Sequence, residues 1–251
     1  MKFLLSRASL PVVTRLAHEQ TLCAFDFDGT LAPIADHPDH AGMRKRTRDL
    51  LRRVASLYPC VVVSGRDRAS VLKKLSGVHV AGVLGNHGAE SGRTPGPRRD
   101  VKRWKAALQP ELDPLAGTWI EKKEFSLAIH YRQSPSKAEA RRRILAAAGK
   151  LKNVRVFGGK DVVNVTGRLA PHKGDAIAAE RDRLQCNWVL YLGDDENDED
   201  AFALGGNMVP VCIGRKRRTH ARYYLRTQTE IDDLLDLLAQ LREAERKASS
   251  Q

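Results

Sequence analysis

The chain has 251 residues, of which 42% are hydrophobic and 29% are charged, and its formal net charge is +13. This composition is that of an ordinary soluble globular protein, long enough for one large domain or two small ones. No apolar stretch approaches the roughly 18–20 residues that a membrane-spanning helix needs, so we expect no membrane partner.

The positive charge is concentrated in the middle of the chain. Residues 92–169 contain 18 lysines and arginines but only 7 aspartates and glutamates, an excess of 11 positive charges. Such an excess is compatible with three kinds of partner: a nucleic acid, an anionic surface or a small phosphorylated molecule.

The first 17 residues begin like a secretory signal, with a lysine followed by apolar residues. Arg7 and Arg15 interrupt this stretch, so it lacks a continuous apolar segment of about 7–15 residues. We therefore expect a short N-terminal helix and a cytoplasmic location. The four cysteines show no C-x-x-C spacing, so we expect buried, reduced thiols rather than a disulfide or a zinc site.

Short apolar runs alternate with helix-like segments along most of the chain, which indicates an α/β unit with a parallel sheet covered by helices. The predicted strands are 21–26, 60–63, 79–84, 188–192 and 208–213. The predicted helices are 43–57, 67–76, 174–185, 198–204 and a last amphipathic helix with Ile231, Leu234, Leu235, Leu238 and Leu241 on one side.

Residues 92–169 have a different pattern. GRTPGP (92–97) resembles a linker, and after a helical stretch two alternating runs, TWIEKKE and FSLAIHYR, predict a hairpin. A helix at 136–150 and two further strands, NVRVF and DVVNV, follow. We therefore predict a strand-rich second domain inserted into the first.

Two aspartates follow the first predicted strand. In an extended chain residues two apart point the same way, so Asp26 and Asp28 project together from the edge where open α/β sheets bind ligands. Two such close negative charges favour a hard cation between them, and Mg²⁺ fits best. Gly29 permits a tight turn, and Thr30 offers a hydroxyl and an N–H to an anion.

Three further motifs stand at strand or helix ends. In VVVSGR (61–66), Ser64 and Arg66 can bind a phosphate group, although a simple turn is the commoner reason for this pattern. Lys173 stands at the start of a predicted helix, where an anion is favoured, although a solvated lysine is the default there. YLGDDENDED (191–200) brings carboxylates to the same sheet edge, and this density favours a cation over a solvated acidic turn.

Together, in this order, the four motifs resemble those of the haloacid dehalogenase (HAD) superfamily of phosphatases, over roughly residues 20–90 and 170–240. The resemblance implies a Rossmann-like parallel-sheet core, Mg²⁺ as the cofactor, Asp26 as the nucleophile that forms an aspartyl-phosphate, and Asp28 as the general acid/base. It implies phosphate binding by Ser64 and Lys173. We add Thr30, for its hydroxyl and N–H donors, and Arg66, for its positive charge, as further phosphate-binding residues. It implies a metal site at Asp26, Asp28 and Asp194, supported by Asn197 and Asp198.

The insert corresponds in this resemblance to the superfamily's α/β C2-type cap, which selects the leaving group. The predicted domains are therefore a core of residues 1–91 and 170–251 and a cap of residues 92–169. GNHGAE (85–90), IEKKEFSLAIHYR (120–132) and the closing ARYYLRTQTEIDDLL (221–235) resemble the trehalose-6-phosphate phosphatase family, over nearly the full chain. That family implies hydrolysis of trehalose 6-phosphate to trehalose and phosphate.

The predicted hairpin carries residues that suit a sugar. Glu121, Lys123, His130 and Arg132 alternate along it, so one face can offer donors and acceptors to hydroxyl groups, although an ordinary solvated sheet face has the same pattern. The last strand of the insert has Asn164-Val165-Thr166-Gly167 where the family usually has E-I-R-P. Asn164 can still bond a hydroxyl, but the identity of the disaccharide stays open.

Other functions also stay open at this stage. Sucrose phosphate and mannosyl- or glucosyl-phosphoglycerate are alternative substrates of the same chemistry. A nucleic-acid-binding protein would use the basic insert and GRKRRTHAR (214–222), but no RNP1, KH or basic-zipper pattern is present, so we expect no nucleic acid partner. A silent regulatory homologue is disfavoured because both aspartates of the first motif are present. We expect a monomer.

Overall fold

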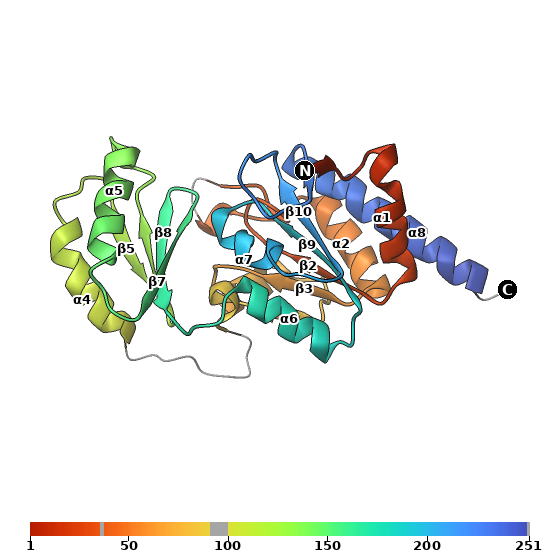
Figure 1. Cartoon of the computed structure of the whole chain (residues 1–251), viewed down its shortest axis with the longest axis horizontal. Helices are drawn as coiled ribbons and strands as arrows, with labels where there is room; N and C mark the ends of the chain where they lie inside the picture. The colour runs from red at the N-terminus through yellow and green to blue at the C-terminus, as the bar shows by residue number, and fades with distance from the viewer. Residues whose placement is uncertain (36–37, 91–99, 250–251) are drawn as a thin grey trace. The chain divides into compact units, whose positions relative to one another are not determined.

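The computed structural model describes residues 1–35, 38–90 and 100–249. The chain divides into two compact units (Figure 1). The first unit comprises Met1–Ser91, His172–Asp194 and Asp198–Gln251, and the second comprises Gly92–Pro171 and Asp195–Asn197. We keep the sequence-based domain boundaries, 91/92 and 169/170, as a proposal.

A parallel seven-stranded sheet forms the centre of the first unit, in the order β1-β11-β10-β9-β2-β3-β4. Its strands are β1 (Lys2–Phe3), β2 (Thr21–Phe25), β3 (Cys60–Val63), β4 (Gly82–Leu84), β9 (Trp188–Gly193), β10 (Met208–Ile213) and β11 (Tyr223–Leu225). From β2 the chain continues outward to β3 and β4 at one edge of the sheet. From β9 it continues in the opposite direction, to β10 and β11. The carboxyl ends of β2 and β9 therefore flank the point where the strand order reverses, which is where such sheets bind ligands.

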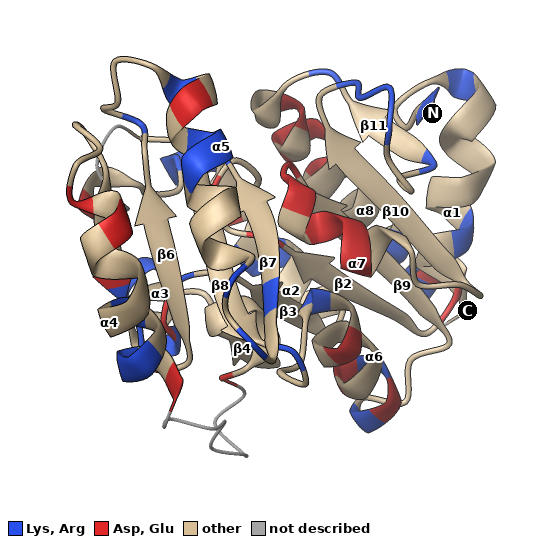
Figure 2. Ribbon diagram, turned by 60° about the vertical axis from the view of Figure 1, so that its left-hand side comes forward, with Lys and Arg blue, Asp and Glu red and all other residues tan. Residues whose placement is uncertain are grey.

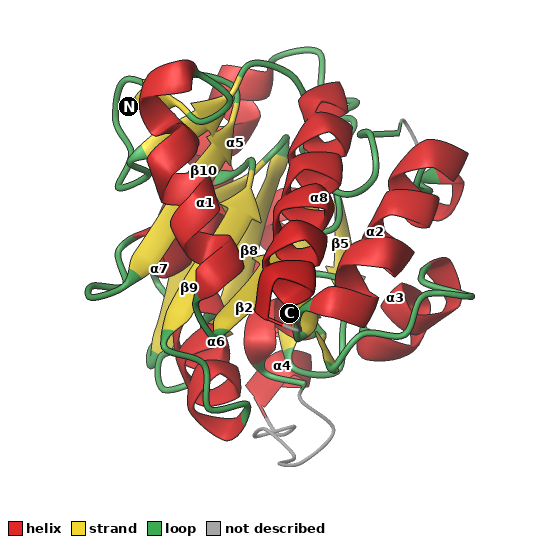
Figure 3. Cartoon of the chain, turned by 90° about the vertical axis from the view of Figure 1, so that its right-hand side faces the viewer, coloured by secondary structure: helices red, strands yellow, loops and turns green. Residues whose placement is uncertain are grey.

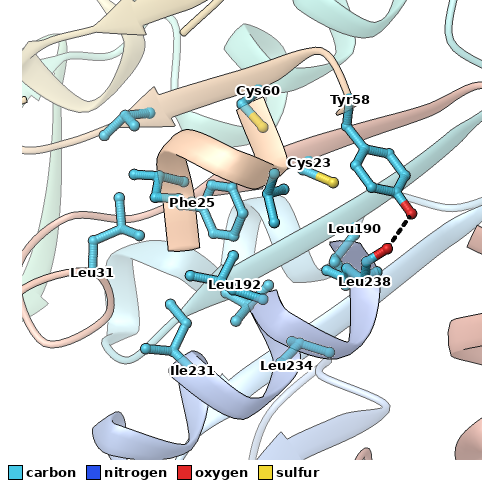
Figure 4. Close-up of a cluster of buried hydrophobic side chains, with 14 of the residues drawn as sticks. Cys23, Phe25, Leu31, Tyr58, Cys60, Leu190, Leu192, Ile231, Leu234 and Leu238 are labelled. Carbon is cyan, nitrogen blue, oxygen red and sulfur yellow. Dashed lines mark hydrogen bonds between the residues drawn. The ribbon is translucent and has the colours of Figure 1, made fainter. Parts of the chain in front are cut away.

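Helices cover both faces of this sheet (Figure 3). The first face is covered by α1 (Leu10–His18), α2 (Lys45–Leu57), α3 (Arg68–Lys74) and α8 (Ile231–Ser249), and the second by α6 (Lys173–Arg183) and α7 (Glu199–Phe202). Because side chains alternate along a strand, Cys23 and Phe25 of β2 enter the first core, whereas Leu22 and Ala24 enter the second. Figure 4 shows part of the first core.

Most predicted elements of the first unit are confirmed, and the differences lie at its edges. The N-terminal helix begins at Leu10, with Pro11 in its first turn, and not at the start of the chain. The residues before it form β1, which pairs with β11, and the sequence predicts neither of these two strands. The third predicted strand is shorter than 79–84, because pairing with β3 begins only where Ala81 N–H donates to the Cys60 carbonyl. All four cysteines are buried and free, as predicted.

The second unit has an antiparallel sheet in the order β5-β6-β8-β7. Its elements are α4 (Asp100–Leu112), β5 (Trp119–Lys122), β6 (Ser126–His130), α5 (Lys137–Ala148), β7 (Val154–Gly159) and β8 (Val162–Gly167). Ile120, Leu127, Ile129, Val163 and Val165 face α4 and α5 and form a separate core. The predicted hairpin, helix and strand pair are confirmed, while the linker GRTPGP lies outside the described residues.

Short 3-10 turns complete the described chain: Arg7–Ser9, Pro38–His40, Asn86–Gly88, Glu196–Asp198 and Gln228–Glu230. A search of the described helices finds none that has both the length and the apolar character to cross a membrane.

Candidate active site

The site forms where β2, β3 and β9 end side by side in the first unit. Asp26 directly follows β2, and its backbone N–H donates to the Leu192 carbonyl of β9, 2.8 Å away. This hydrogen bond continues the strand pairing by one residue. It places the Asp26 side chain, which is 8% exposed, at the carboxyl edge of the sheet.

Lys173 connects two of the acidic motifs. It is the first residue of α6, whose N-cap His172 forms a capping box with Asp175. Its fully buried ammonium group donates to Asp26 Oδ1 at 2.6 Å and to Asp198 Oδ1 at 2.7 Å. A buried ammonium held between two carboxylates fixes the orientation of both, because each of them accepts one of its hydrogen bonds.

Asp198 is the most fully bonded carboxylate of the site. Besides Lys173, it accepts a hydrogen bond from the Tyr191 hydroxyl at 2.5 Å and one from the Asp194 backbone N–H at 2.8 Å. Gly193 makes this packing possible, since a Cβ there would lie 2.3 Å from Asp198 Cγ. The acidic stretch around α7 stands out in red in Figure 2. Asp198 therefore organises the loop that carries Asp194.

Burial and neighbouring charges set the protonation of this cluster. Burial is the largest influence on Asp26 and raises its pKa. Lys173 lowers this pKa, but the negative charges of Asp198 and Asp194 raise it again, so it stays well above the usual range. Burial disfavours the charged form of Lys173, but Asp198 and Asp26 outweigh burial and raise its pKa. Burial, helped by Asp198, also raises the pKa of Tyr191, which keeps the phenol a donor. One ammonium thus faces more than one carboxylate.

The residues present fit a divalent cation. Carboxylate oxygens of Asp26, Asp194 and Asp198 lie within 4.8 Å of one another. Since three donors already occupy Asp198, Asp26 and Asp194 are the better ligands, and oxygen donors of this kind suit Mg²⁺. Gly29, with φ of +87°, lets the first motif approach Asp194, because a Cβ there would lie 2.1 Å from Asp194 Oδ2.

Asp28 and Arg66 form an ion pair that the sequence did not predict. The guanidinium donates from Nε to Asp28 Oδ2 and from Nη2 to Asp28 Oδ1, both at 2.7 Å. The Arg66 side chain is 14% exposed and that of Asp28 is 37% exposed. Arg66, which we expected to bind phosphate, is thus engaged with the neighbouring carboxylate and fixes its orientation.

The two predicted hydroxyl groups lie at the same edge of the sheet. Ser64 follows β3, is buried, and its Oγ accepts a hydrogen bond from Arg66 N–H at 3.1 Å. Thr30 is also buried, and within the described part of the chain its Oγ1 has no hydrogen-bond partner. Both hydroxyl groups therefore belong to the segments that we expect to bind the phosphate.

Two further residues belong to this site, although sequence reasoning assigned them elsewhere. Tyr191 lies in the predicted strand 188–192 and opens the motif 191–200, but the sequence gives its hydroxyl no role, because that role depends on a contact with Asp198, seven residues away. Lys216, part of the basic run 214–222, donates to the Asp194 carbonyl at 2.6 Å. This lysine therefore belongs to the first unit, and the signal for it is its place three residues after the end of β10.

The predicted sugar-binding residues all lie in the second unit. Glu121 and His130 lie on the face of the sheet that points away from α4 and α5. Asn164 lies on the same face, because Ala128 of β6 pairs with Glu121 on one side and with Asn164 on the other. His130 Nε2 lies 2.8 Å from Glu121 Oε2, and Lys123 Nζ lies 3.9 Å from the same oxygen. Arg132 follows the end of β6, and its Nε lies 3.8 Å from Asp161 Oδ2. Asn197, expected to support the metal, also groups with this unit.

Comparisons with known proteins agree with this arrangement. The sequence profile of the trehalose-phosphatase family matches residues 24–226. A trehalose-phosphate phosphatase from Mycobacterium tuberculosis is 31% identical over 268 residues, which cover 96% of this chain and 67% of that protein.

Two solved structures share the fold. The C-terminal domain of trehalose-6-phosphate phosphatase from C. albicans has a TM-score of 0.78 at 22% identity, covering 92% of this chain and 96% of that one. A phosphatase of the HAD superfamily from Bacteroides thetaiotaomicron has a TM-score of 0.63 at 17% identity, covering 89% and 96%. The chain is therefore a phosphatase with the HAD fold, and it belongs to the trehalose-phosphatase family.

Proposed function

We propose that this chain hydrolyses trehalose 6-phosphate to trehalose and phosphate through an aspartyl-phosphate on Asp26. The observation that carries the proposal is the buried Asp26 carboxylate, held by Lys173 beside Asp194 at the carboxyl edge of the sheet. The names of the family and of its relatives support the substrate.

In the first step an Asp26 oxygen attacks phosphorus, and the bond from phosphorus to the sugar oxygen breaks. Asp28 donates a proton to that sugar oxygen as it leaves, so trehalose departs neutral. In the second step Asp28 takes a proton from water, whose oxygen attacks the aspartyl-phosphate. Phosphate leaves and the Asp26 carboxylate is restored.

The neighbouring residues hold the reacting groups in place. Lys173 neutralises part of the negative charge around Asp26, and the two hydrogen bonds from Arg66 hold the carboxylate form of Asp28, which is the form that takes a proton from water in the second step. Ser64 and Thr30 offer hydroxyl groups to the phosphoryl oxygens. Asp26 and Asp194, with the Asp28 carbonyl, would hold Mg²⁺, which when bound neutralises charge on the transferred phosphoryl group.

The second unit is proposed to select the leaving group. The sheet face away from α4 and α5 carries the carboxylate of Glu121 and the amide of Asn164. Lys123 directly follows β5, and its ammonium lies 3.9 Å from the Glu121 carboxylate. These three groups are suitable partners for sugar hydroxyls. We propose that these residues, with Arg132, recognise the disaccharide, and that His130 holds Glu121 in place through the 2.8 Å contact of its Nε2 with Glu121 Oε2. A phosphoglycerate glycoside would need a further cation for its carboxylate.

The test is phosphate release from a panel of esters, with and without Mg²⁺. The panel contains trehalose 6-phosphate, sucrose 6-phosphate, glucosyl-3-phosphoglycerate and p-nitrophenyl phosphate. We expect the highest kcat/KM for trehalose 6-phosphate, loss of activity with EDTA, and recovery when Mg²⁺ is added back. A higher kcat/KM for another sugar phosphate would make that ester the substrate in place of trehalose 6-phosphate. Full activity of a metal-stripped sample would refute the requirement for Mg²⁺.

A further inference from the structure

A half-exposed tryptophan lies at the start of the sheet in the second unit. Trp119 is the first residue of β5 and is 49% exposed, and no other aromatic side chain of the described residues is among the exposed large hydrophobic ones. Its neighbour Ile120 points to the other side of the strand, into the core beneath α4 and α5. Trp119 is therefore not part of that core.

The indole is held by its cross-strand partner. Trp119 pairs with His130 in the register of β5 and β6, and the two rings stack with centroids 4.1 Å apart and planes 13° apart. His130 Nε2 lies 2.8 Å from Glu121 Oε2, which fixes the imidazole by its edge. Because one face of the indole lies against His130, its exposed surface is the opposite face and the ring edge.

This contact revises the role expected for His130. We predicted that it would bond a sugar hydroxyl, but its Nε2 is engaged with Glu121 and one ring face with Trp119. His130 is therefore better described as a positioning residue that orders two neighbours. The surface that these neighbours offer combines an apolar ring with a carboxylate and, 3.9 Å from that carboxylate, the ammonium of Lys123.

We propose that Trp119 is a stacking platform for a pyranose ring of the substrate's leaving group, an inference that rests on the proposed function. A pyranose presents a face of C–H groups surrounded by hydroxyls, so it matches a flat aromatic ring bordered by hydrogen-bonding groups. The carboxylate of Glu121 beside the platform disfavours a polyanion such as a nucleic acid, whose bases could also stack on an indole.

Turnover separates a platform from a merely structural residue. Trp119→Ala is expected to lower kcat/KM for trehalose 6-phosphate about 10-fold, mainly through KM, because binding of the remote sugar is lost. For glycerol 2-phosphate, which has no ring, kcat/KM should change less than about twofold. Trp119→Phe retains a ring and should keep most of the activity. Leu169→Ala removes an apolar side chain of the same unit that is 97% exposed, and should change neither substrate.

Two variants of the supporting histidine test its positioning role. His130→Phe keeps the stack but loses the contact with Glu121, whereas His130→Ala loses both. If His130 orders Trp119, the alanine variant should raise KM for trehalose 6-phosphate more than the phenylalanine variant does. Equal losses in both variants would assign the effect to the Glu121 contact alone.

A binding measurement reads the platform without turnover. Trehalose 6-phosphate, sucrose 6-phosphate and glucosyl-3-phosphoglycerate are titrated into Asp26→Asn and into Asp26→Asn/Trp119→Phe, and tryptophan fluorescence is recorded. We expect a change in the first protein that is absent from the second. No Trp119-dependent change with any of these glycosides, or a Trp119→Ala loss that is equal for both esters, would overturn the platform. A wild type that spares trehalose 6-phosphate but hydrolyses another glycoside would overturn only the proposed substrate.

Discussion

The two units of this phosphatase place their charges in different surroundings. In the first unit Lys173, Asp26 and Asp198 are buried and joined by hydrogen bonds of 2.6 and 2.7 Å. In the second unit Glu121 is 38% exposed, and its contact with Lys123 is 3.9 Å long. Buried, fully bonded charges cannot be removed without a large cost, whereas partly exposed pairs contribute little to stability. We therefore expect substitutions of the charged residues in the first unit to lower both stability and turnover. Substitutions of those in the second unit should change mainly which substrate is preferred.

The largest expected effect is on Asp26, the proposed nucleophile. Asp26→Asn keeps the shape of the side chain but removes the oxygen anion that attacks phosphorus, so turnover should fall by about 10³-fold or more. All esters should be affected alike, because each needs the same attack. Phosphate release from trehalose 6-phosphate and p-nitrophenyl phosphate measures this, with near-ultraviolet circular dichroism as the control for folding. Substantial residual turnover of either ester would remove Asp26 from the role.

The second effect separates buried from exposed charge. Asp198→Asn leaves Asp26 to balance Lys173, but an amide has only one oxygen for the three donors that Asp198 accepts, so the free energy of unfolding should fall by about 2 kcal/mol. Tyr191→Phe removes one hydrogen bond from the same carboxylate and should cost about 1 kcal/mol. Glu121→Gln, in the partly exposed cluster of the second unit, should cost less than about 1 kcal/mol. Urea unfolding of the three variants measures these values, and equal losses for Asp198→Asn and Glu121→Gln would contradict the comparison.

The difference between buried and partly exposed residues also explains which parts of the site could be predicted from the sequence. Asp26, Ser64 and Asp194 follow apolar runs that can only be buried strands, so their meeting at one sheet edge follows from the parallel topology. The strands β1 and β11 have only two and three residues, too few for a periodic signal, and β1 pairs with a segment more than 200 residues away in the sequence.

Side-chain partners were harder to predict than positions. The Asp28–Arg66 pair depends on which way two long side chains turn at the ends of neighbouring strands, and no spacing rule fixes that choice. In the second unit the alternation correctly placed Glu121 and His130 on one face. It did not indicate that His130 would be occupied by Trp119 and Glu121, because cross-strand register depends on the turn between the strands.

The third prediction concerns substrate choice in the second unit. Lys123→Ala or Arg132→Ala should lower kcat/KM for trehalose 6-phosphate by the equivalent of about 1–3 kcal/mol, the usual scale for a charge-assisted hydrogen bond. The value for p-nitrophenyl phosphate should stay close to wild type, because that ester has no sugar to lose. The measurement is kcat/KM of both variants with trehalose 6-phosphate, sucrose 6-phosphate and p-nitrophenyl phosphate. Equal losses on all three esters would mean that these side chains do not select the sugar.

The smallest effect tests whether the interior of the first unit keeps a buried phenol protonated at high pH. The Tyr58 hydroxyl donates to the Leu238 carbonyl at 3.0 Å (Figure 4), and burial raises its pKa above the usual value of about 10. Above pH 10 the unfolded chain loses this proton while the folded protein keeps it. The free energy of unfolding therefore falls as pH rises, by at most about 1.4 kcal/mol per pH unit for this group.

Tyr58→Phe removes this titration, although it also removes one hydrogen bond, which should cost about 1 kcal/mol at neutral pH. Between pH 10 and pH 11 the variant should therefore lose less stability than the wild type, and the two should approach each other. Tyr191 and Cys212, whose pKa values burial also raises, to about 12 for Cys212, leave part of the alkaline slope in both proteins. Urea unfolding at pH 8, 9, 10 and 11 measures the slopes. Parallel slopes for the two proteins would show that Tyr58 already ionises in the folded state, with Arg242, whose guanidinium lies 4.3 Å from the centre of its ring, as the partner of the phenolate.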